Sequence, residues 1–237
     1  MRLGHMQLNA ILIGLHRRAR QAFAGGLATA AVWLIAALAV SPGAAAQTML
    51  VMLGDSVTAG YGLAARDAIP TRLETRLRAA GYDVRIVNAG VSGDTTAGGL
   101  ARLDWSVPRT ADGVIVALGA NDMLQGQPIA TTRSNLAEIL TRLKARGQKM
   151  ALVGMRANPG LGRAYQTAFD GLFASLSKAH GAPLYPFLLD GVALDPRLTQ
   201  SDGIHPNAAG AEIISARLAP FVVQAFALKK TLAVRAR

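Results

Sequence analysis

Five short apolar segments, spaced at similar intervals along the chain, constrain the fold more than any other feature of the sequence. They are residues 49–53, 84–87, 113–118, 150–155 and 184–189. Each has the length of a β-strand and is mainly apolar rather than alternating, with Arg85 the one charged residue, which is typical of strands buried on both faces of a parallel sheet. The sequence therefore predicts a parallel sheet of five strands.

The segments between these runs have the spacing of amphipathic helices. In residues 69–80, Leu73 and Leu77 lie four positions apart, and the segment ends before Gly81, a residue suited to a helix C-terminus. Further helices are predicted around residues 136–143, 168–176 and 213–223. Strand followed by helix, repeated with short connections, predicts a doubly wound α/β sandwich in one domain over residues 47–228. In such folds ligands bind beyond the carboxyl ends of the strands.

Residues 1–46 differ from the rest of the chain. They contain four arginines and no acidic residue, followed by an apolar run at 22–40 and three alanines at 44–46. These features are typical of a secretory signal peptide, and we predict cleavage after Ala46. The alternative is an uncleaved membrane anchor, because about 19 apolar residues can just span a bilayer. The leader predicts a periplasmic or secreted protein, and because the chain has no cysteine, packing rather than disulfides must stabilise it.

The chain is basic, with a formal net charge of +11, of which the leader arginines supply four. Much of the remaining positive charge, about +7, lies on predicted helix faces and in a basic C-terminal tail, residues 229–237. Aromatic residues make up only 5% of the chain. Because nucleic-acid surfaces combine basic side chains with aromatic ones for base stacking, we expect no nucleic-acid partner. Solvated helix faces explain the charge most simply, and attraction to anionic lipid head groups is the alternative.

Polar motifs that contain glycine follow the predicted strands. They are Gly54-Asp55-Ser56, residues 88–96 (NAGVSGDTT), residues 119–124 (GANDML) and residues 201–207 (SDGIHPN). Glycine lets the backbone approach a reacting group closely. The simplest interpretation of the first motif is a capped turn, since Asp and Ser are favoured helix N-caps. The other interpretation is that Ser56 is a nucleophile held at the end of a strand.

Asp202 and His205 have the spacing of a carboxylate–imidazole pair. Asp202-Gly203 favours a turn, and Pro206 biases His205 away from helix, so the two side chains can face one another. A carboxylate on one imidazole nitrogen sets the tautomer and leaves the other nitrogen free to accept a hydroxyl proton. The same pattern also fits an ordinary turn or two ligands of a metal ion. No His-Glu-x-x-His motif accompanies it, which disfavours metal.

Acyl transfer also requires hydrogen-bond donors for the developing oxyanion. Three candidates follow predicted strands: the backbone N–H of Ser56, the backbone N–H of Gly93 and the side-chain amide of Asn121. The alternative for Gly93 is a plain turn before a helix capped by Asp94 or Thr95. For Asn121 the alternative is a side-chain turn after the strand.

Taken together, the four motifs resemble those of the SGNH hydrolases, also called the GDSL esterase and lipase family. The matching residues are Ser56 in GDSVTAGYG, Gly93 in SGDTTAGGL, Asn121 in GAND and His205 in DGIHPN. The likeness runs over residues 49–223 and is specific, because four spaced motifs must agree. Within the family it is closest to bacterial multifunctional esterases of the thioesterase I, protease I and lysophospholipase L1 type. One departure is Val57, where the family motif has leucine.

This resemblance implies a flavodoxin-like three-layer α/β/α sandwich with a five-stranded parallel sheet. It also implies a serine esterase that hydrolyses carboxylic esters and thioesters of acyl chains, of arylesterase, acyl-CoA thioesterase or lysophospholipase type, through an acyl-enzyme on Ser56. His205 is then general base and acid, and Asp202 orients it. Ser56, Gly93 and Asn121 hold the oxyanion. This chemistry requires no metal and no cofactor.

Loops after the third and fourth strands are predicted to line the acyl pocket, with apolar surface from Met123, Leu124, Pro159 and Leu161. Asp55 and Asp94 are interpreted as structural caps. The expected partner is a small-molecule acyl ester or thioester, and we expect a monomer. One alternative is a carbohydrate O-deacetylase of the same family, although Trp105 is the only tryptophan outside the leader that could stack on a sugar. The other is a non-catalytic periplasmic binding protein.

Overall fold

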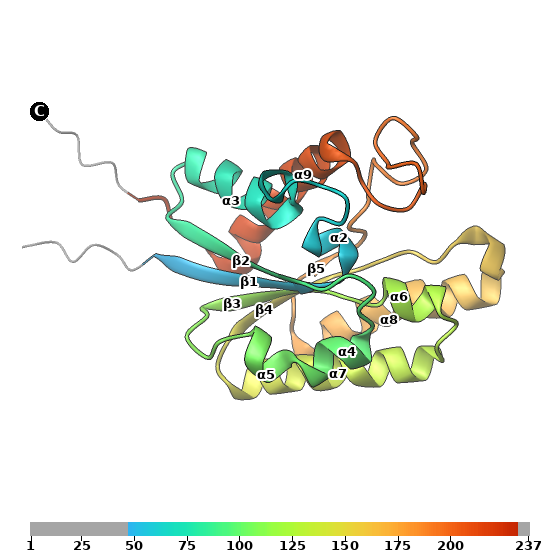
Figure 1. Ribbon diagram of the computed structural model, residues 1–237. Helices are drawn as coiled ribbons and strands as arrows, with labels where there is room; N and C mark the ends of the chain where they lie inside the picture. The colour runs from blue at the N-terminus through green and yellow to red at the C-terminus, as the bar shows by residue number, and fades with distance from the viewer. Residues whose placement is uncertain (1–46, 232–237) are drawn as a thin grey trace, which may run out of the picture. The chain divides into compact units, whose positions relative to one another are not determined.

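A parallel sheet of five strands forms the middle layer of the structure, a computed structural model that describes residues 47–231 (Figure 1). The strands are β1 Thr48–Gly54, β2 Val84–Gly90, β3 Gly113–Ala117, β4 Lys149–Val153 and β5 Leu184–Tyr185. Their order across the sheet is β2-β1-β3-β4-β5. This is the strand order of flavodoxin-like doubly wound folds, so the predicted fold class is confirmed.

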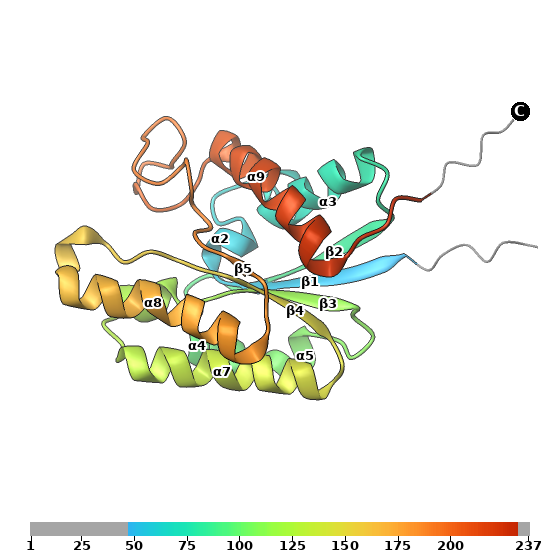
Figure 2. The ribbon, with the colours of Figure 1, turned by 180° about the vertical axis from the view of Figure 1, so that it is seen from behind.

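Helices cover both faces of the sheet (Figures 1 and 2). One face is covered by α2 Ser56–Ala59, α3 Ile69–Ala79 and α9 Ala208–Phe226. The other is covered by α4 Thr96–Ala101, α5 Leu103–Ser106, α7 Ile129–Ala145 and α8 Arg163–His180. The remaining elements are α6 Ala120–Leu124 and two short 3-10 turns, η1 Ala65–Asp67 and η2 Pro159–Leu161. The sheet is therefore buried on both sides.

Successive residues of β1 enter the two cores in turn. Leu50 and Met52 pack with α3 and α9, whereas Val51 and Leu53 pack with α7 and α8. All four side chains are fully buried. Because side chains alternate between the faces of a strand and both faces are covered, every position must be apolar. This explains the apolar runs that predict the sheet, whereas β2, at the edge of the sheet, carries the exposed Arg85.

The last strand is shorter than predicted. We expected a strand over residues 184–189, but β5 contains only Leu184 and Tyr185. Pro186 follows, and it has no N–H group to donate to a ladder. The chain stays against β4 through Gly154, whose N–H donates to the Tyr185 carbonyl and whose carbonyl accepts from the Leu188 N–H. Residues 186–189 therefore form a turn at the edge of the sheet.

The predicted signal peptide, residues 1–46, lies outside the described residues, as do residues 232–237 of the predicted basic tail. The described start of that tail contacts the domain, because Lys230 forms an isolated antiparallel bridge with Tyr82. Both described cores lie within the compact unit Ala46–Arg237, so a chain that begins at Gln47 contains every residue of these two cores. Among the helices described in residues 47–231, none is long and apolar enough to cross a membrane.

Candidate active site

Ser56 is the first residue of α2, directly after the carboxyl end of β1. The carboxylate of Asp55 accepts a hydrogen bond from the Val57 N–H at 3.0 Å and caps the helix. The cap that the motif suggested is therefore Asp55 and not Ser56. As a result, the Ser56 hydroxyl is free to bond elsewhere.

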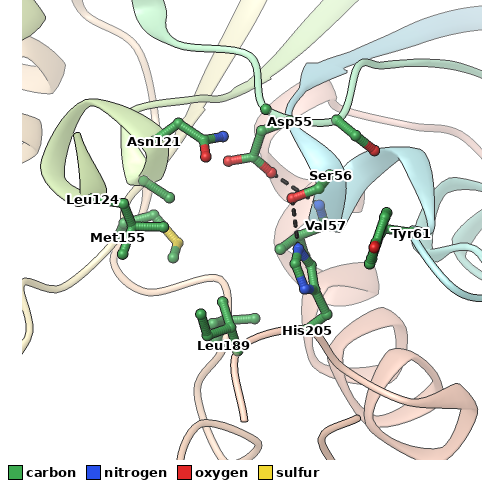
Figure 3. A pocket seen from close by; sticks show the side chains of 13 residues that line it. Asp55, Ser56, Val57, Tyr61, Asn121, Leu124, Met155, Leu189 and His205 are labelled. Carbon is green, nitrogen blue, oxygen red and sulfur yellow. Dashed lines mark hydrogen bonds between the residues drawn. The ribbon is translucent and has the colours of Figure 1, made fainter. Parts of the chain in front are cut away.

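The Ser56 hydroxyl lies against His205, from a loop far along the chain (Figure 3). His205 Nε2 is 2.8 Å from Ser56 Oγ, and His205 Nδ1 is 2.7 Å from Asp202 Oδ2. The other carboxylate oxygen of Asp202 accepts the backbone N–H groups of Ile204 and His205 at 2.9 and 3.0 Å. The three side chains thus form a continuous hydrogen-bonded chain from carboxylate through imidazole to hydroxyl.

The electrostatics of Asp202 favour this arrangement. The His205 backbone N–H, the His205 ring and the Ile204 N–H all donate to the carboxylate and lower the pKa of Asp202 to about 2. Asp202 is therefore ionised at neutral pH. An anion beside Nδ1 favours the tautomer with the proton on that nitrogen, which leaves Nε2 as the acceptor for the Ser56 hydroxyl.

The loop that carries His205 is fixed by Gln200. The Gln200 N–H donates to the His205 carbonyl at 2.8 Å, and its side-chain amide donates to the carbonyls of Tyr61 and Pro206. The ring of Tyr61 also lies against the imidazole, with centroids 4.7 Å apart. Backbone bonds and ring contact together hold the imidazole toward β1.

The three predicted oxyanion donors lie around the same pocket. Gly93 has a φ of +81°, and a Cβ placed there would meet nothing within 4 Å, so the backbone conformation rather than space requires glycine. Asn121 donates one amide hydrogen to the Asp94 carbonyl at 2.9 Å, which leaves its second hydrogen available. Within residues 47–231, the N–H groups of Ser56 and Gly93 have no hydrogen-bond partner. The site therefore offers three unsatisfied donors.

The interpretation of Asp94 as a cap is wrong. Thr95 caps α4, accepting the Gly98 N–H, while the Asp94 carboxylate forms an ion pair with Arg102. Asn121 does not form the alternative side-chain turn either, because it lies within α6 and bonds to the Asp94 loop. The ion pair of Asp94 with Arg102, eight positions further along the chain, has no local signature in the sequence.

Asp55 is almost fully buried beneath the site. Burial, which disfavours the charged form, raises the pKa of Asp55 to about 6, although the Val57 N–H works in the opposite direction. The carboxyl is therefore close to half protonated in mildly acidic solution.

A cavity of about 220 Å³ opens beside Ser56 and His205. Its lining comprises Asp55, Ser56, Val57, Tyr61, Ser92, Gly93, Ala120, Asn121, Leu124, Met155, Leu189, Ile204 and His205. Figure 3 shows Leu124, Met155 and Leu189 gathered on the side of the pocket away from Tyr61. The cavity thus combines the hydrogen-bonded chain, the donors and an apolar wall.

Of the four apolar residues predicted to line the pocket, Leu124 does so and three do not. Met123 points into the core beneath α7 and α8, because neighbouring residues of a short helix face different ways. Pro159 and Leu161 belong to η2, which projects beyond the cavity. The prediction missed Met155 and Leu189, although Met155 is the second residue after β4 and could have been found by its position at a strand end.

Comparison with known proteins agrees with this geometry. A sequence profile of the GDSL-like lipase/acylhydrolase family matches residues 52–213, which contain every residue of the hydrogen-bonded chain and all three donors. The chain belongs to this family. The predicted family and enzyme class, a GDSL-type ester hydrolase, are therefore confirmed.

Individual members of the GDSL family are similar in sequence to this chain over most of their length. Esterase TesA of Pseudomonas aeruginosa is 41% identical over 167 residues, which cover 70% of this chain and 83% of that protein. Thioesterase 1/protease 1/lysophospholipase L1 of Escherichia coli K12 is 39% identical over 168 residues, which cover 69% and 78%. A crystal structure of TesA superposes with a TM-score of 0.72 at 35% identity, over 75% of this chain and 99% of that one.

Proposed function

We propose that this GDSL hydrolase cleaves acyl esters and thioesters through a covalent acyl-enzyme on Ser56. The observation that carries the proposal is the hydrogen-bonded chain from Asp202 through His205 to Ser56 at 2.7 and 2.8 Å. A serine hydroxyl becomes an effective nucleophile when an adjacent, correctly oriented base can take its proton.

Acylation begins with the attack of Ser56 Oγ on the acyl carbonyl carbon. His205 Nε2 takes the hydroxyl proton, and Asp202 stabilises the imidazolium that forms. The charge on the carbonyl oxygen develops toward the N–H groups of Ser56 and Gly93 and the free amide hydrogen of Asn121. His205 then donates its proton to the leaving alcohol or thiol as the tetrahedral intermediate collapses.

Deacylation repeats these steps with water as the nucleophile. His205 takes a proton from water, which attacks the acyl-enzyme carbonyl, and the same donors hold the second oxyanion. The proton then returns to Ser56 Oγ as the carboxylic acid leaves. Every proton transfer passes through Nε2, so the reaction needs only groups of this chain.

The pocket supports short and medium acyl groups. Its apolar wall (Leu124, Met155, Leu189 and Ile204) suits an alkyl or aryl group. At about 220 Å³ the cavity is smaller than the roughly 300–1,000 Å³ of common ligand pockets. Longer chains would therefore extend over the surface around the pocket mouth.

The two alternative functions gain no support from the site. A deacetylase that holds a sugar ring would need an aromatic platform, but Tyr61 is the only aromatic lining residue besides the His205 ring, and Trp105 lies in α5 on the far side of the sheet. A binding protein would not require a serine paired with an oriented histidine. We further propose that residues 1–46 act as a signal peptide that directs export of the protein, and that the protein acts as a monomer.

Labelling with a fluorophosphonate tests the nucleophile directly. We expect the folded protein to become labelled at Ser56 and the Ser56→Ala variant to remain unlabelled. Ser92 also lines the pocket, so Ser92→Ala is the matched control and should be labelled like the parent. Labelling that survives Ser56→Ala would exclude Ser56 as the nucleophile.

Substrate preference can be measured on p-nitrophenyl esters of increasing length, acyl-CoA thioesters, lysophospholipids and acetylated sugars. We expect cleavage of p-nitrophenyl butyrate and octanoate and weak cleavage of acetylated sugars. Activity restricted to acetylated sugars would instead identify the deacetylase.

A further inference from the structure

Exposed apolar side chains gather at one end of the sheet. Six large hydrophobic residues are exposed on loops and short helices that follow the carboxyl ends of the strands: Tyr61, Val91, Leu124, Leu161, Leu194 and Ile204. We call these six residues the apolar rim. Three of them, Tyr61, Leu124 and Ile204, also line the pocket, so the apolar rim includes part of the pocket wall and continues onto neighbouring segments at the same end of the sheet.

The opposite end of the sheet is different. Among residues 47–231, the only other large hydrophobic residue that is exposed is Trp105, in α5. In both views α5 lies toward the end at which the strands begin, whereas residues 155–163 and 190–206 project beyond the end at which they finish (Figures 1 and 2). A random scatter of exposed apolar residues is ordinary on protein surfaces, but a cluster around a pocket marks an interaction site.

Leu194 is the most exposed member of the apolar rim, with 86% of its surface accessible. It also has a φ of +67°, a left-handed conformation that bulky residues rarely adopt. Glycine or asparagine would fit this backbone better and would be better solvated. Folding alone therefore does not favour leucine here, and strain of this kind is concentrated at functional positions.

Positive charge accompanies the apolar rim. Arg156 and Arg163 are exposed on either side of Leu161, and no carboxylate in residues 47–231 forms an ion pair with either. Arg163 occupies the first turn of α8, where the helix dipole disfavours a cation. The Asp170 carboxylate lies at the same loop, but it accepts the backbone N–H of Ala157 at 2.8 Å and forms no ion pair with either arginine. Arg156 also lies over the ring of Phe187, 5.1 Å from its centroid. The two arginines are therefore exposed cations without an ion pair beside exposed apolar side chains.

We propose that the apolar rim, with Arg156 and Arg163, docks on an anionic phospholipid surface and brings the pocket mouth to the lipid. Apolar side chains enter the boundary between head groups and acyl chains, and guanidinium groups bind the phosphates above it. The choice of a phospholipid surface as the partner rests on the proposed function, because an esterase finds many of its acyl ester substrates in membranes. A second copy of this chain fits less well, since a contact between two rims would bring unpaired arginines together.

The test is sedimentation with vesicles of equimolar phosphatidylglycerol and phosphatidylcholine, using the chain from Gln47 with Ser56→Ala to prevent hydrolysis. The rim variant is Leu194→Asn with Arg163→Gln, because asparagine tolerates the left-handed backbone. The matched control is Trp105→Ser with Arg109→Gln, which removes one exposed apolar side chain and one exposed cation at the other end.

We expect the rim variant to bind at least about ten-fold more weakly than its parent and the control to stay within about two-fold. Binding of the parent to pure phosphatidylcholine should also be weaker. Equal losses in both variants, or no binding by the parent, would overturn the proposal. So would light scattering in which the rim variant loses a dimer while vesicle binding is unchanged, since this would identify a contact between copies.

Hydrolysis of soluble p-nitrophenyl acetate separates this proposal from the proposed function. With Ser56 restored, the rim variant and its parent should have equal kcat/KM. If the chain with Ser56 hydrolyses the ester but the Ser56→Ala parent does not bind vesicles, only the docking proposal fails. If the Ser56→Ala parent binds vesicles but the chain with Ser56 hydrolyses nothing, only the proposed function fails.

Discussion

Arg102 forms a buried ion pair with Asp94, in which Nε lies 2.6 Å from Oδ2. The same guanidinium donates through Nη2 to the Gly54 carbonyl at 2.9 Å. The Asp94 carbonyl in turn accepts the amide of Asn121. Arg102 therefore connects the ends of β1 and β2 and the start of α6, the three places that supply the proposed oxyanion donors.

Replacing Arg102 by methionine should destabilise the protein strongly. The variant leaves Asp94 buried without its partner, and breaking a buried pair in this way costs about 3–5 kcal/mol. Urea unfolding measures the loss. Arg142→Met is the control, because its pairs with Glu138 and Asp104 are exposed, and its midpoint should barely move. Similar midpoints for the two variants would contradict the structural role of Arg102.

Asp202→Asn should lower kcat/KM for p-nitrophenyl butyrate by about 10⁴-fold. The amide can donate a hydrogen to Nδ1 and so favour the tautomer in which Nε2 carries the proton and cannot accept from Ser56. Asp195→Asn, on the same segment but paired with Arg197, should leave the rate within about two-fold. A loss below ten-fold for Asp202→Asn would show that this carboxylate does not orient His205.

Asn121→Ala should lower kcat by about 10²–10³-fold with little change in KM, because the lost hydrogen bond is made to the transition state. Steady-state kinetics on p-nitrophenyl esters measure both constants. Asn158 caps η2 outside the pocket, so Asn158→Ala should change neither. An Asn121→Ala variant with raised KM and unchanged kcat would place Asn121 in substrate binding instead.

Asp55 predicts a stability change with pH. Its pKa is about 6 in the folded protein against an ordinary value of 3.8, so the native state holds the proton more tightly than the unfolded state. The contribution of this carboxyl to the free energy of unfolding is therefore fully present below about pH 4. It is lost as the pH rises through 6, which lowers the free energy of unfolding by about 3 kcal/mol. The lowered pKa of Asp202 acts in the opposite direction, but only below its ordinary value of 3.8.

Asp55→Asn isolates this effect, because asparagine keeps the oxygen that accepts the Val57 N–H. The free energy of unfolding, measured from pH 4 to pH 8, should fall less steeply for the variant than for the parent. The two curves should diverge as the pH rises, with the variant higher at pH 8. Parallel curves would show that Asp55 is not protonated in this range.

The sequence by itself determined the sheet and the identity of the candidate site residues. A strand covered on both faces is apolar at most positions, so the strands could be found without knowledge of their neighbours, although β2 carries the exposed Arg85 and β5 is shorter than predicted. The polar residues then had to lie at the strand ends, where Ser56, Gly93, Asn121 and His205 were expected and where the structure places them. The sheet needed only local patterns and the geometry of parallel sheets, whereas the choice of these residues over ordinary turns rested on the resemblance of the four motifs to those of the SGNH family.

Only the tertiary structure decided which side chains meet. His205 contacts Ser56 across 149 positions of sequence. Asp94 forms an ion pair with Arg102 and does not cap a helix. Met123 enters the core, while its neighbour Leu124 lines the pocket. Each outcome depends on how α-helices pack on a twisted sheet and hence on where each Cα–Cβ bond points. The same packing gathers six exposed apolar residues at the end of the sheet that carries the pocket, although they are scattered along the chain. A residue's type limits what it can bind, whereas the packed fold determines what lies within its reach.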